Sequence, residues 1–288
     1  MLDLALSLDT ELAQAVRIAT SAGKLIKRLR LEGLGTHEKD DASIVTTADL
    51  ASDDLITQEL SRVFPADGVL SEESGHRAGT SGRTWVIDPL DGTSGFAKGL
   101  ATYSVHVGLL IGHEPVLGVV VEPDAGRVYR AIKGVGAFLS TEAHSTMRQL
   151  RVTNRDTLGD MRLVASSRCP KEHLESLRTH MGTREVRVLS SVGCKVGQVV
   201  RREADIYYSV HALGYWDTCA PLVIHEAAGG VFTTTTGALL SYDCENGSFV
   251  HTEPVVATNA KVHGACLEAI ANAESLSPSH ESRPPSGI

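Results

Sequence analysis

Cysteine pairs, long apolar runs and an excess of positive charge are all missing from this sequence of 288 residues. Its five cysteines form no Cys-x-x-Cys pair, and an odd count without a signal peptide indicates reduced thiols. The N-terminus has neither a basic segment nor a cleavable apolar one. No run approaches the roughly 20 apolar residues that span a bilayer. We therefore expect a soluble, cytoplasmic protein without a membrane partner.

The charge balance is acidic, with 27 Lys and Arg against 35 Asp and Glu and a net charge of -8. Such a balance gives no general attraction to nucleic acid polymers or to anionic membranes. An anionic ligand would need local positive charge, which metal ions could supply. The hydrophobic content of 42% over this length is enough for one large or two ordinary domains with a sizeable core.

The pattern of apolar residues changes near residue 147. Before it, periodicity predicts amphipathic helices over 10–33 and 48–63 and an antiparallel meander over 103–139. After the polar stretch 140–145, predicted strands alternate with helices, which is typical of α/β structure. The sequence thus predicts an α+β region followed by an α/β region.

We divide the chain accordingly into two domains and a tail. Residues 1–147 form the predicted N-terminal α+β half, which carries most of the acidic motifs described below. Residues 148–273 form the predicted C-terminal α/β half. Residues 274–288 are rich in Ser and Pro and poor in apolar side chains, so we predict a disordered tail without an assigned function.

In the motif WVIDPLDGTSGF, residues 85–96, a predicted apolar strand is followed at once by two carboxylates, Asp88 and Asp91. A protein core does not accept unpaired carboxylates, so a cation is expected where these side chains meet. Pro89 is expected to stop the strand and to bend the chain, so that both acids face one point. Two hard oxygen ligands at one point are suited to Mg²⁺.

The three residues that follow, Gly92, Thr93 and Ser94, can open a helix. The free N–H groups and the positive dipole end of such a helix accept a phosphate. A metal site and a phosphate site would then lie side by side. The alternative is an Asp-Pro turn followed by an ordinary Thr or Ser cap.

Further acidic residues occur in three other motifs. Glu72 and Glu73 follow a short predicted strand in VLSEES, and Asp217 begins a predicted helix in YWDTCAPL. Taken singly, Glu72 and Glu73 are more typical of a solvated turn, and Asp217 is equally typical of a plain helix cap. The segment before the second helix adds four more polar residues, for which capping is again the simpler account: Lys39, Asp41, Thr46 and Asp49.

The order of four motifs along the chain resembles one family. KDDASIVTTAD (39–49), SEES (71–74), WVIDPLDGT (85–93) and WDTCAP (216–221) resemble the inositol monophosphatase superfamily of Mg²⁺-dependent, lithium-sensitive phosphatases. The resemblance extends over residues 10–273. It implies a layered αβαβα sandwich, an α+β half followed by an α/β half, with the active site between the two.

The resemblance also implies which residues bind metal. Two or three Mg²⁺ ions would be held by four carboxylates and one main-chain carbonyl: Glu72, Asp88, Asp91, Asp217 and the carbonyl of Leu90. These are the hard oxygen ligands that Mg²⁺ uses beside a substrate phosphate. Asp41 and Glu73 would not bind the metal themselves but would support the residues that do.

Catalysis is implied for Asp49 and Thr93. The hydroxyl of Thr93, bridging to Asp49, would position the water that attacks phosphorus. The backbone amides of Gly92 and Thr93, together with Ser94, would bind the phosphate being removed. The implied partner is a small-molecule phosphate ester.

Two residues favour a bisphosphate nucleotide as that ester. The inositol enzymes carry a Glu after a Tyr pair where this chain has Ser209, and Lys195 stands where the bisphosphate nucleotidases carry a Lys suited to a second phosphate. We therefore predict a 3'(2'),5'-bisphosphate nucleotidase that converts 3'-phosphoadenosine 5'-phosphate to AMP and phosphate. The chain departs from many nucleotidases at Cys169 and Pro170, where they place a His, and at Val192, where they place a Ser.

Two alternatives stay open. One is an inositol-phosphate phosphatase, and the other is a non-catalytic, phosphatase-like regulator that binds a nucleotide. The regulator would be expected to have lost a metal-binding or water-activating residue, yet all are present. A homodimer agrees with the resemblance, although no interface motif is evident. We interpret His106 and His225 as core residues without a catalytic role, because both lie in apolar segments.

Overall fold

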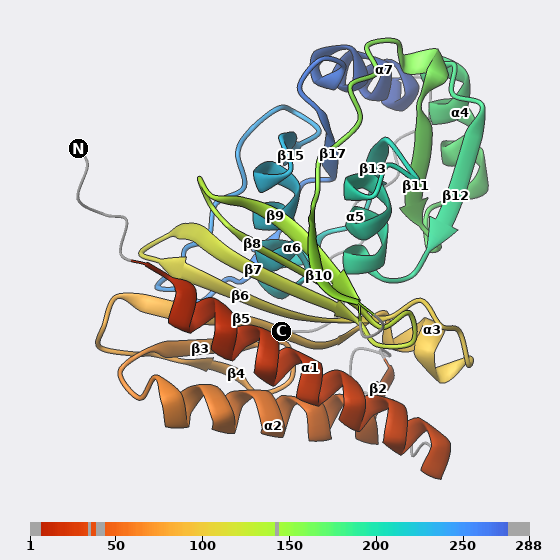
Figure 1. The fold of residues 1–288 in the computed structure, drawn as a ribbon. Coiled ribbons are helices and arrows are strands. Elements are labelled where there is room, and N and C mark those ends of the chain that lie inside the picture. Colours follow the sequence, from red (N-terminus) through yellow and green to blue (C-terminus); the bar gives the residue numbers. More distant parts are fainter. Residues whose placement is uncertain (1–6, 34–35, 39–43, 142–143, 276–288) are drawn as a thin grey trace.

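The computed structural model describes residues 7–33, 36–38, 44–141 and 144–275. Five layers follow one another: a helix pair, an eight-stranded sheet, a second helix pair, a five-stranded sheet and a third helix pair (Figure 1). The predicted αβαβα sandwich is therefore confirmed. No helix among the described residues has the length and apolar character needed to cross a membrane.

The first helix layer contains α1 (Asp9–Glu32) and α2 (Thr47–Val63), close to the predicted bounds of both helices. The buried face of α1 recurs every three or four residues from Ala15 to Ile26, and it packs on the sheet. A small antiparallel sheet precedes α2 and consists of β1 (Thr36–Glu38) and β2 (Ile44–Thr46).

The eight-stranded sheet has the order β10-β9-β8-β7-β6-β5-β3-β4. All its neighbours are antiparallel except β3 and β5, which are parallel. The predicted meander is confirmed, and β10, which begins within the polar stretch, extends it by one strand. The strands are β3 (Gly68–Ser71), β4 (Gly75–Arg77), β5 (Arg83–Asp91), β6 (Ser104–Ile111), β7 (Glu114–Glu122), β8 (Arg127–Ile132), β9 (Gly136–Thr141) and β10 (His144–Gln149).

The expectation that Pro89 stops a strand is wrong. β5 continues through Pro89 to Asp91, and its pairing with β6 shifts between Asp88, opposite His106, and Asp91, opposite Ser104. Three steps along β5 thus match two steps along β6, which is a bulge with one extra residue. A bulge accommodates proline because the extra residue does not take part in the ladder.

The second half of the chain builds the five-stranded sheet, with the order β12-β11-β13-β17-β15. β11, β12 and β13 are parallel, whereas β17 is antiparallel to β13 and β15. Strands β14 (Leu213–Gly214) and β16 (Val250–His251) form a separate pair. The five strands of the sheet are β11 (Arg162–Ser166), β12 (Glu185–Leu189), β13 (Ile206–Ser209), β15 (Gly230–Thr234) and β17 (Val255–Asn259).

Helices cover both faces of this second sheet. α5 (Val192–Val200) and α6 (Tyr215–Ala227) lie between the two sheets, and α4 (Lys171–Met181) packs against α7 (His263–Ser275) on the outer face (Figure 1). A 3₁₀ turn, η1 (Leu158–Asp160), precedes β11. α7 continues to Ser275, two residues into the predicted tail, and the rest of that tail, residues 276–288, lies outside the described part of the chain.

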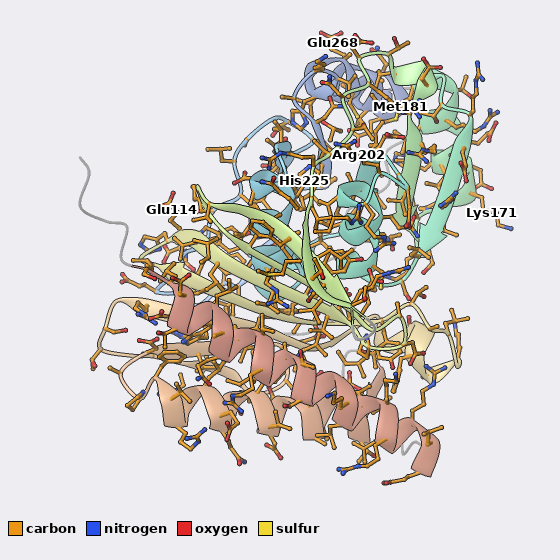
Figure 2. The ribbon with its side chains drawn as sticks, in the orientation of Figure 1. Glu114, Lys171, Met181, Arg202, His225 and Glu268 are labelled. Atoms are coloured by element: carbon orange, nitrogen blue, oxygen red, sulfur yellow. The ribbon has the colours of Figure 1, made fainter. Side chains whose placement is uncertain are left out.

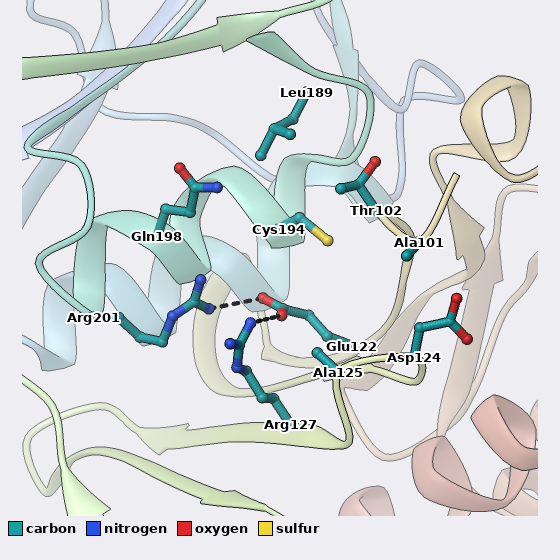
Figure 3. Close-up of a pocket in the computed structure, with 10 residues that line it drawn as sticks. All are labelled: Ala101, Thr102, Glu122, Asp124, Ala125, Arg127, Leu189, Cys194, Gln198 and Arg201. Carbon is teal, nitrogen blue, oxygen red and sulfur yellow. Dashed lines mark hydrogen bonds and ion pairs between the residues drawn. The ribbon is translucent and has the colours of Figure 1, made fainter. Parts of the chain in front are cut away.

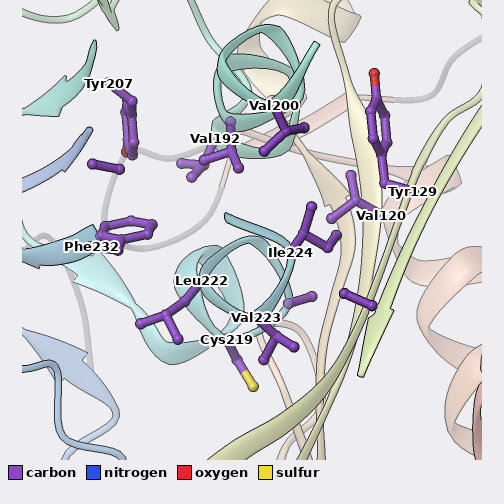
Figure 4. Close-up of a cluster of buried hydrophobic side chains, with 14 of the residues drawn as sticks. Val120, Tyr129, Val192, Val200, Tyr207, Cys219, Leu222, Val223, Ile224 and Phe232 are labelled. Carbon is purple, nitrogen blue, oxygen red and sulfur yellow. The ribbon is translucent and has the colours of Figure 1, made fainter. Parts of the chain in front are cut away.

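The largest hydrophobic cluster joins the two sheets through the central helices. Val192 and Val200 of α5 and Ile224 of α6 meet Tyr129 of the first sheet and Phe232 of the second (Figure 4). The charged side chains of Glu114, Lys171 and Glu268 lie at the periphery, whereas His225 is completely buried in α6 (Figure 2). Because α5 and α6 are enclosed on both sides, their N-terminal turns are held firmly against the end of β5.

Candidate active site

Three of the predicted carboxylates meet at the end of β5. Asp88 and Asp91 come from this strand, and Asp217 comes from the first turn of α6. One oxygen from each lies within 4.8 Å of the others, the spacing of ligands around one cation. Asp88 and Asp91 are buried and Asp217 is half-buried. The fold therefore joins acids that are more than 120 residues apart in sequence into one cluster.

The electrostatics of the cluster show an excess of negative charge. Burial raises the pKa of Asp88 well above its usual value, and the charges of Glu72, Asp91 and Asp217 add to the shift. Burial, together with the charge of Asp91, raises the pKa of Asp217 to about 6. A divalent cation relieves both burial and mutual repulsion, so these donors fit Mg²⁺.

Asp91 differs from its neighbours because one of its oxygens is fully engaged. Oδ2 accepts hydrogen bonds from Ser191 Oγ at 2.6 Å, Gly193 N at 2.8 Å and Ser104 Oγ at 3.1 Å. His106 Nε2 lies 3.1 Å from the same oxygen. Burial raises the pKa of Asp91, but His106, Lys195 and Ser191 outweigh burial and lower it.

Sequence reasoning missed these contacts to Asp91. His106 is indeed buried, as interpreted, but it faces a predicted metal ligand. Ser104 and His106 alternate with valines in β6, so the polar pair shares one face of an otherwise apolar strand. That pattern was a usable signal for a buried polar network. No sequence signal connects this strand with Ser191, which precedes α5.

The predicted pair of Asp49 and Thr93 is in direct contact. Thr93 Oγ1 donates to Asp49 Oδ1 at 2.8 Å and lies 3.0 Å from the carbonyl oxygen of Leu90. Asp49 belongs to the first turn of α2, where Thr46 and Asp49 form a reciprocal capping box. Burial raises the pKa of Asp49, against the opposing effect of hydrogen bonds from Thr46 and Thr93.

Gly92 forms the turn between β5 and the short helix α3 (Thr93–Ala97). Its φ of +93° lies in the left-handed region that favours glycine, and a Cβ there would lie 3.1 Å from the Cβ of Ser191. Thr93 is half-buried, whereas Ser94 is exposed. The first-turn amides of a helix have no partner within it, and in α3 these are the amides of Thr93 and Ser94, which follow Asp91 by two and three residues.

The two residues predicted to select the substrate are both buried. Lys195 is 1% exposed, and its Nζ donates to the carbonyl oxygens of Ser190 at 3.1 Å and Leu189 at 3.3 Å. Burial lowers its pKa to about 8, against the opposing charges of Asp91 and Asp217. Ser209, at the end of β13, is 2% exposed. Neither side chain faces an open surface.

Glu72 and Glu73 lie in the turn that follows β3. Glu72 follows β3, and its amide donates to the carbonyl oxygen of Ile87 at 3.3 Å. Its charge acts on Asp88, as described above. Glu73 is half-buried in the same turn. Asp41 lies outside the described residues.

A cavity of about 280 Å³ lies elsewhere, between the β7–β8 turn and α5 (Figure 3). None of the predicted site residues lines it. Its charged wall is already paired, since Glu122 contacts Arg127 at 2.9 Å and Arg201 at 3.0 Å. The acidic cluster, and not this cavity, is the candidate active site.

The fold and the site together define a metal-dependent phosphoric monoester hydrolase. The model of the inositol monophosphatase family matches residues 7–275, and the chain belongs to this family. Family membership confirms the predicted superfamily and the prediction of an enzyme over a non-catalytic regulator. The structure supplies an acidic cluster that suits the Mg²⁺ on which such enzymes generally depend.

Individual relatives carry different names. The chain is 31% identical over 251 residues to the 3'(2'),5'-bisphosphate nucleotidase CysQ of Aggregatibacter actinomycetemcomitans, covering 85% of this chain and 91% of that protein. It is 33% identical over 235 residues to a histidinol-phosphatase of Streptomyces coelicolor, covering 80% and 87%. The Thermotoga maritima IMPase shares the fold with a TM-score of 0.79 at 23% identity, covering 92% and 98%.

Proposed function

We propose that this protein is a 3'(2'),5'-bisphosphate nucleotidase that hydrolyses 3'-phosphoadenosine 5'-phosphate to AMP and phosphate. The resemblance to CysQ supports this assignment. The absence of a carboxylate at Ser209 supports it as well, because an acid there would repel a second phosphate. The observation that carries the proposal is the positive charge beside Asp217.

That positive charge comes from Lys195 and Arg168. Lys195 is buried, but Arg168 is exposed at the end of β11. Burial is the main influence on three pKa values near the cluster: it raises the pKa of Asp217 and lowers those of Lys195 and His211. The charge of Arg168 acts on all three groups and lowers the pKa of each. Arg168 is therefore close to the acidic cluster and open to solvent. A guanidinium in this position suits a second phosphate, in the role that the sequence had suggested for Lys195.

The chemistry follows from the contacts of the remaining residues. We assign Glu72, Asp88, Asp91, Asp217 and the carbonyl of Leu90 to Mg²⁺, and the amides of Gly92, Thr93 and Ser94 to the phosphate. Bound Mg²⁺ supplies Lewis acidity, which lowers the pKa of a coordinated water and offsets phosphate charge. Thr93 Oγ1 and Asp49 orient the attacking water, and the raised pKa of Asp49 favours acceptance of its proton.

The charge of the uncleaved part of the substrate separates the candidates. It is negative in 3'-phosphoadenosine 5'-phosphate, neutral in inositol 1-phosphate and positive in histidinol phosphate. We expect phosphate release with Mg²⁺ to be fastest for the bisphosphate. A preference for inositol 1-phosphate would instead favour the alternative, an inositol-phosphate phosphatase.

Arg168→Gln tests the assignment directly. A charge-assisted contact with phosphate contributes about 1.5–3 kcal/mol, so kcat/KM for the bisphosphate should fall roughly 10- to 150-fold. The value for inositol 1-phosphate should change little. Arg184→Gln is the matched control, since Arg184 is also exposed but precedes β12 next to the start of β11, at the opposite end of that strand from Arg168. An equal loss with both substrates would remove Arg168 as the selecting residue.

A further inference from the structure

His106 contacts both elements that carry the acidic cluster, because one ring nitrogen faces Asp91 of β5 and the other faces Trp216 of α6. Nε2 lies 3.1 Å from Asp91 Oδ2 and 2.9 Å from Ser104 Oγ. Nδ1 lies 3.1 Å from the carbonyl oxygen of Trp216, to which it donates because a carbonyl can only accept. Trp216 immediately precedes Asp217 in the first turn of α6. The imidazole thus bridges β5 and α6.

Asp91 and Asp217 each use one carboxylate oxygen for hydrogen bonds and leave the other oxygen open. The contacts of Asp91 described above all involve Oδ2, and Asp217 accepts the amide of Gly214 at 2.7 Å through its own Oδ2. Each carboxylate is therefore anchored through one oxygen. The other oxygen of each can turn toward the cluster, where the ligand atoms lie within 4.8 Å of one another.

The surroundings hold the imidazole in place. His106 is completely buried, and Gly193 packs directly against it. A side chain at position 193 would collide with both His106 and Ser104, so glycine is needed for the amide of this residue to reach Asp91. The ring cannot rotate away without vacating a buried space and leaving a polar nitrogen without a partner.

We propose that His106 is a positioning residue that fixes the separation of Asp91 and Asp217 for Mg²⁺ binding. The two acids come from different halves of the chain, and the imidazole is a rigid connection between them. Residues that hold metal ligands in place typically affect metal affinity 10- to 100-fold. This inference rests on the proposed metal site, and it does not depend on which phosphate ester is cleaved.

His106→Leu replaces the imidazole with an apolar side chain of similar size and so removes both ring nitrogens. Calorimetric titration with Mg²⁺ alone, without substrate, should show a dissociation constant about 10- to 100-fold above that of the wild type. His225→Leu is the matched control. His225 is equally buried and bonds a main-chain carbonyl, that of Thr258 at 2.9 Å, but it lies in the core away from the acids. Its Mg²⁺ affinity should stay near the wild-type value.

Two conservative variants separate the two contacts. The amide of Gln at position 106 can reach toward Asp91, and that of Asn toward Trp216, so each should restore part of the Mg²⁺ affinity that Leu loses. They also serve if His106→Leu does not fold, which thermal unfolding without Mg²⁺ will reveal. Wild-type Mg²⁺ affinity in the folded variants would overturn the positioning role, as would an equal loss in His225→Leu. Absence of Mg²⁺ binding in the wild type would overturn the metal site itself.

Discussion

Asp88 is the residue whose environment most strongly opposes an unpaired negative charge. It is 1% exposed, and the charges of four other carboxylates raise its pKa in addition to burial. Asp91, three residues along, is stabilised as an anion by hydrogen bonds to a single oxygen. Two acids on one strand thus have opposite pKa shifts. The difference arises from the side chains that each one meets, and not from its own chemistry.

Thr93 is the residue for which the structure gives the sharpest kinetic expectation. Its hydroxyl donates to Asp49, whereas the phosphate is assigned chiefly to backbone amides and metal. Thr93→Ala should therefore lower kcat by roughly 10² to 10⁴ and change KM much less. Steady-state kinetics on the preferred ester measure both. Thr93→Ser, which keeps the hydroxyl, should retain most activity; a rise in KM with constant kcat would make Thr93 a substrate ligand only.

Among the elements, three helix starts converge on the end of β5. α2 supplies Asp49, α5 supplies the amide of Gly193, and α6 supplies Asp217. In α2 and α6 an acidic residue at the third position bonds the amide of the cap residue. The same carboxylates that would serve catalysis therefore also hold the helices in place, so capping and function are not alternatives here.

Thr46 caps α2 and contacts Asp49 at the same time. Its Oγ1 accepts the amides of Ala48 at 3.2 Å and Asp49 at 3.4 Å, and it donates to Asp49 Oδ2. Thr46→Ala should lower the free energy of unfolding by about 1 kcal/mol, as the loss of a cap does. It should also lower kcat roughly tenfold, because Asp49 loses an orienting contact; tenfold corresponds to about 1.4 kcal/mol.

Thr57→Ala is the control on the same helix, since Thr57 lies about three turns from the cap and its hydroxyl donates to the carbonyl oxygen of Asp53 at 2.8 Å. Urea unfolding and steady-state kinetics of both variants make the comparison. If Thr57→Ala lowered kcat as much as Thr46→Ala, the effect would be one of general helix stability.

At the scale of the whole molecule, the active site joins the two halves of the chain. Asp88 belongs to the first sheet, and Asp217 belongs to a helix enclosed between the two sheets. Bringing these carboxylates together opposes folding while they are ionised, and a cation reverses the effect. Stability, pH and metal concentration should therefore be linked.

Burial raises the pKa of Asp217 to about 6 and that of Asp88 well above its usual value, and these two shifts set the sign of the linkage. At these two acids the metal-free folded state binds more protons than the unfolded state above pH 4, so their contribution to stability is lost as pH rises through 6. Mg²⁺ binds the deprotonated acids. At pH 7.5 and about 100 times its dissociation constant, it should raise the free energy of unfolding by about 2.7 kcal/mol.

Thermal unfolding with and without Mg²⁺ between pH 5 and 8 checks this expectation, and the increment should shrink toward pH 5. Asp88→Asn should unfold at a higher temperature than the wild type without Mg²⁺ and should lose both the increment and turnover. Asp54→Asn, an exposed acid on α2, is the control. An increment that stays constant over this pH range would contradict the role of the buried carboxylates.

The sequence alone determined the elements and most of the acidic cluster. Periodicity located α1, α2 and the meander because apolar spacing is a local property of the chain. The motifs around Asp88 and Asp217 identified the acids because their chemistry depends on residue type and order. Apolar spacing and motif order can both be read from the sequence without the structure, so the fold class and the family could be predicted from them.

Only the tertiary structure decided which side chains surround those acids. Ser191 and Gly193 lie 100 and 102 residues from Asp91, and no local pattern connects them. Lys195 was predicted to meet substrate, yet burial at the start of α5 turns it toward main-chain carbonyls. His106 was interpreted as a core residue, and it is one. Its function depends on the two elements that its ring touches, because contacts between distant segments are set by packing and not by sequence spacing.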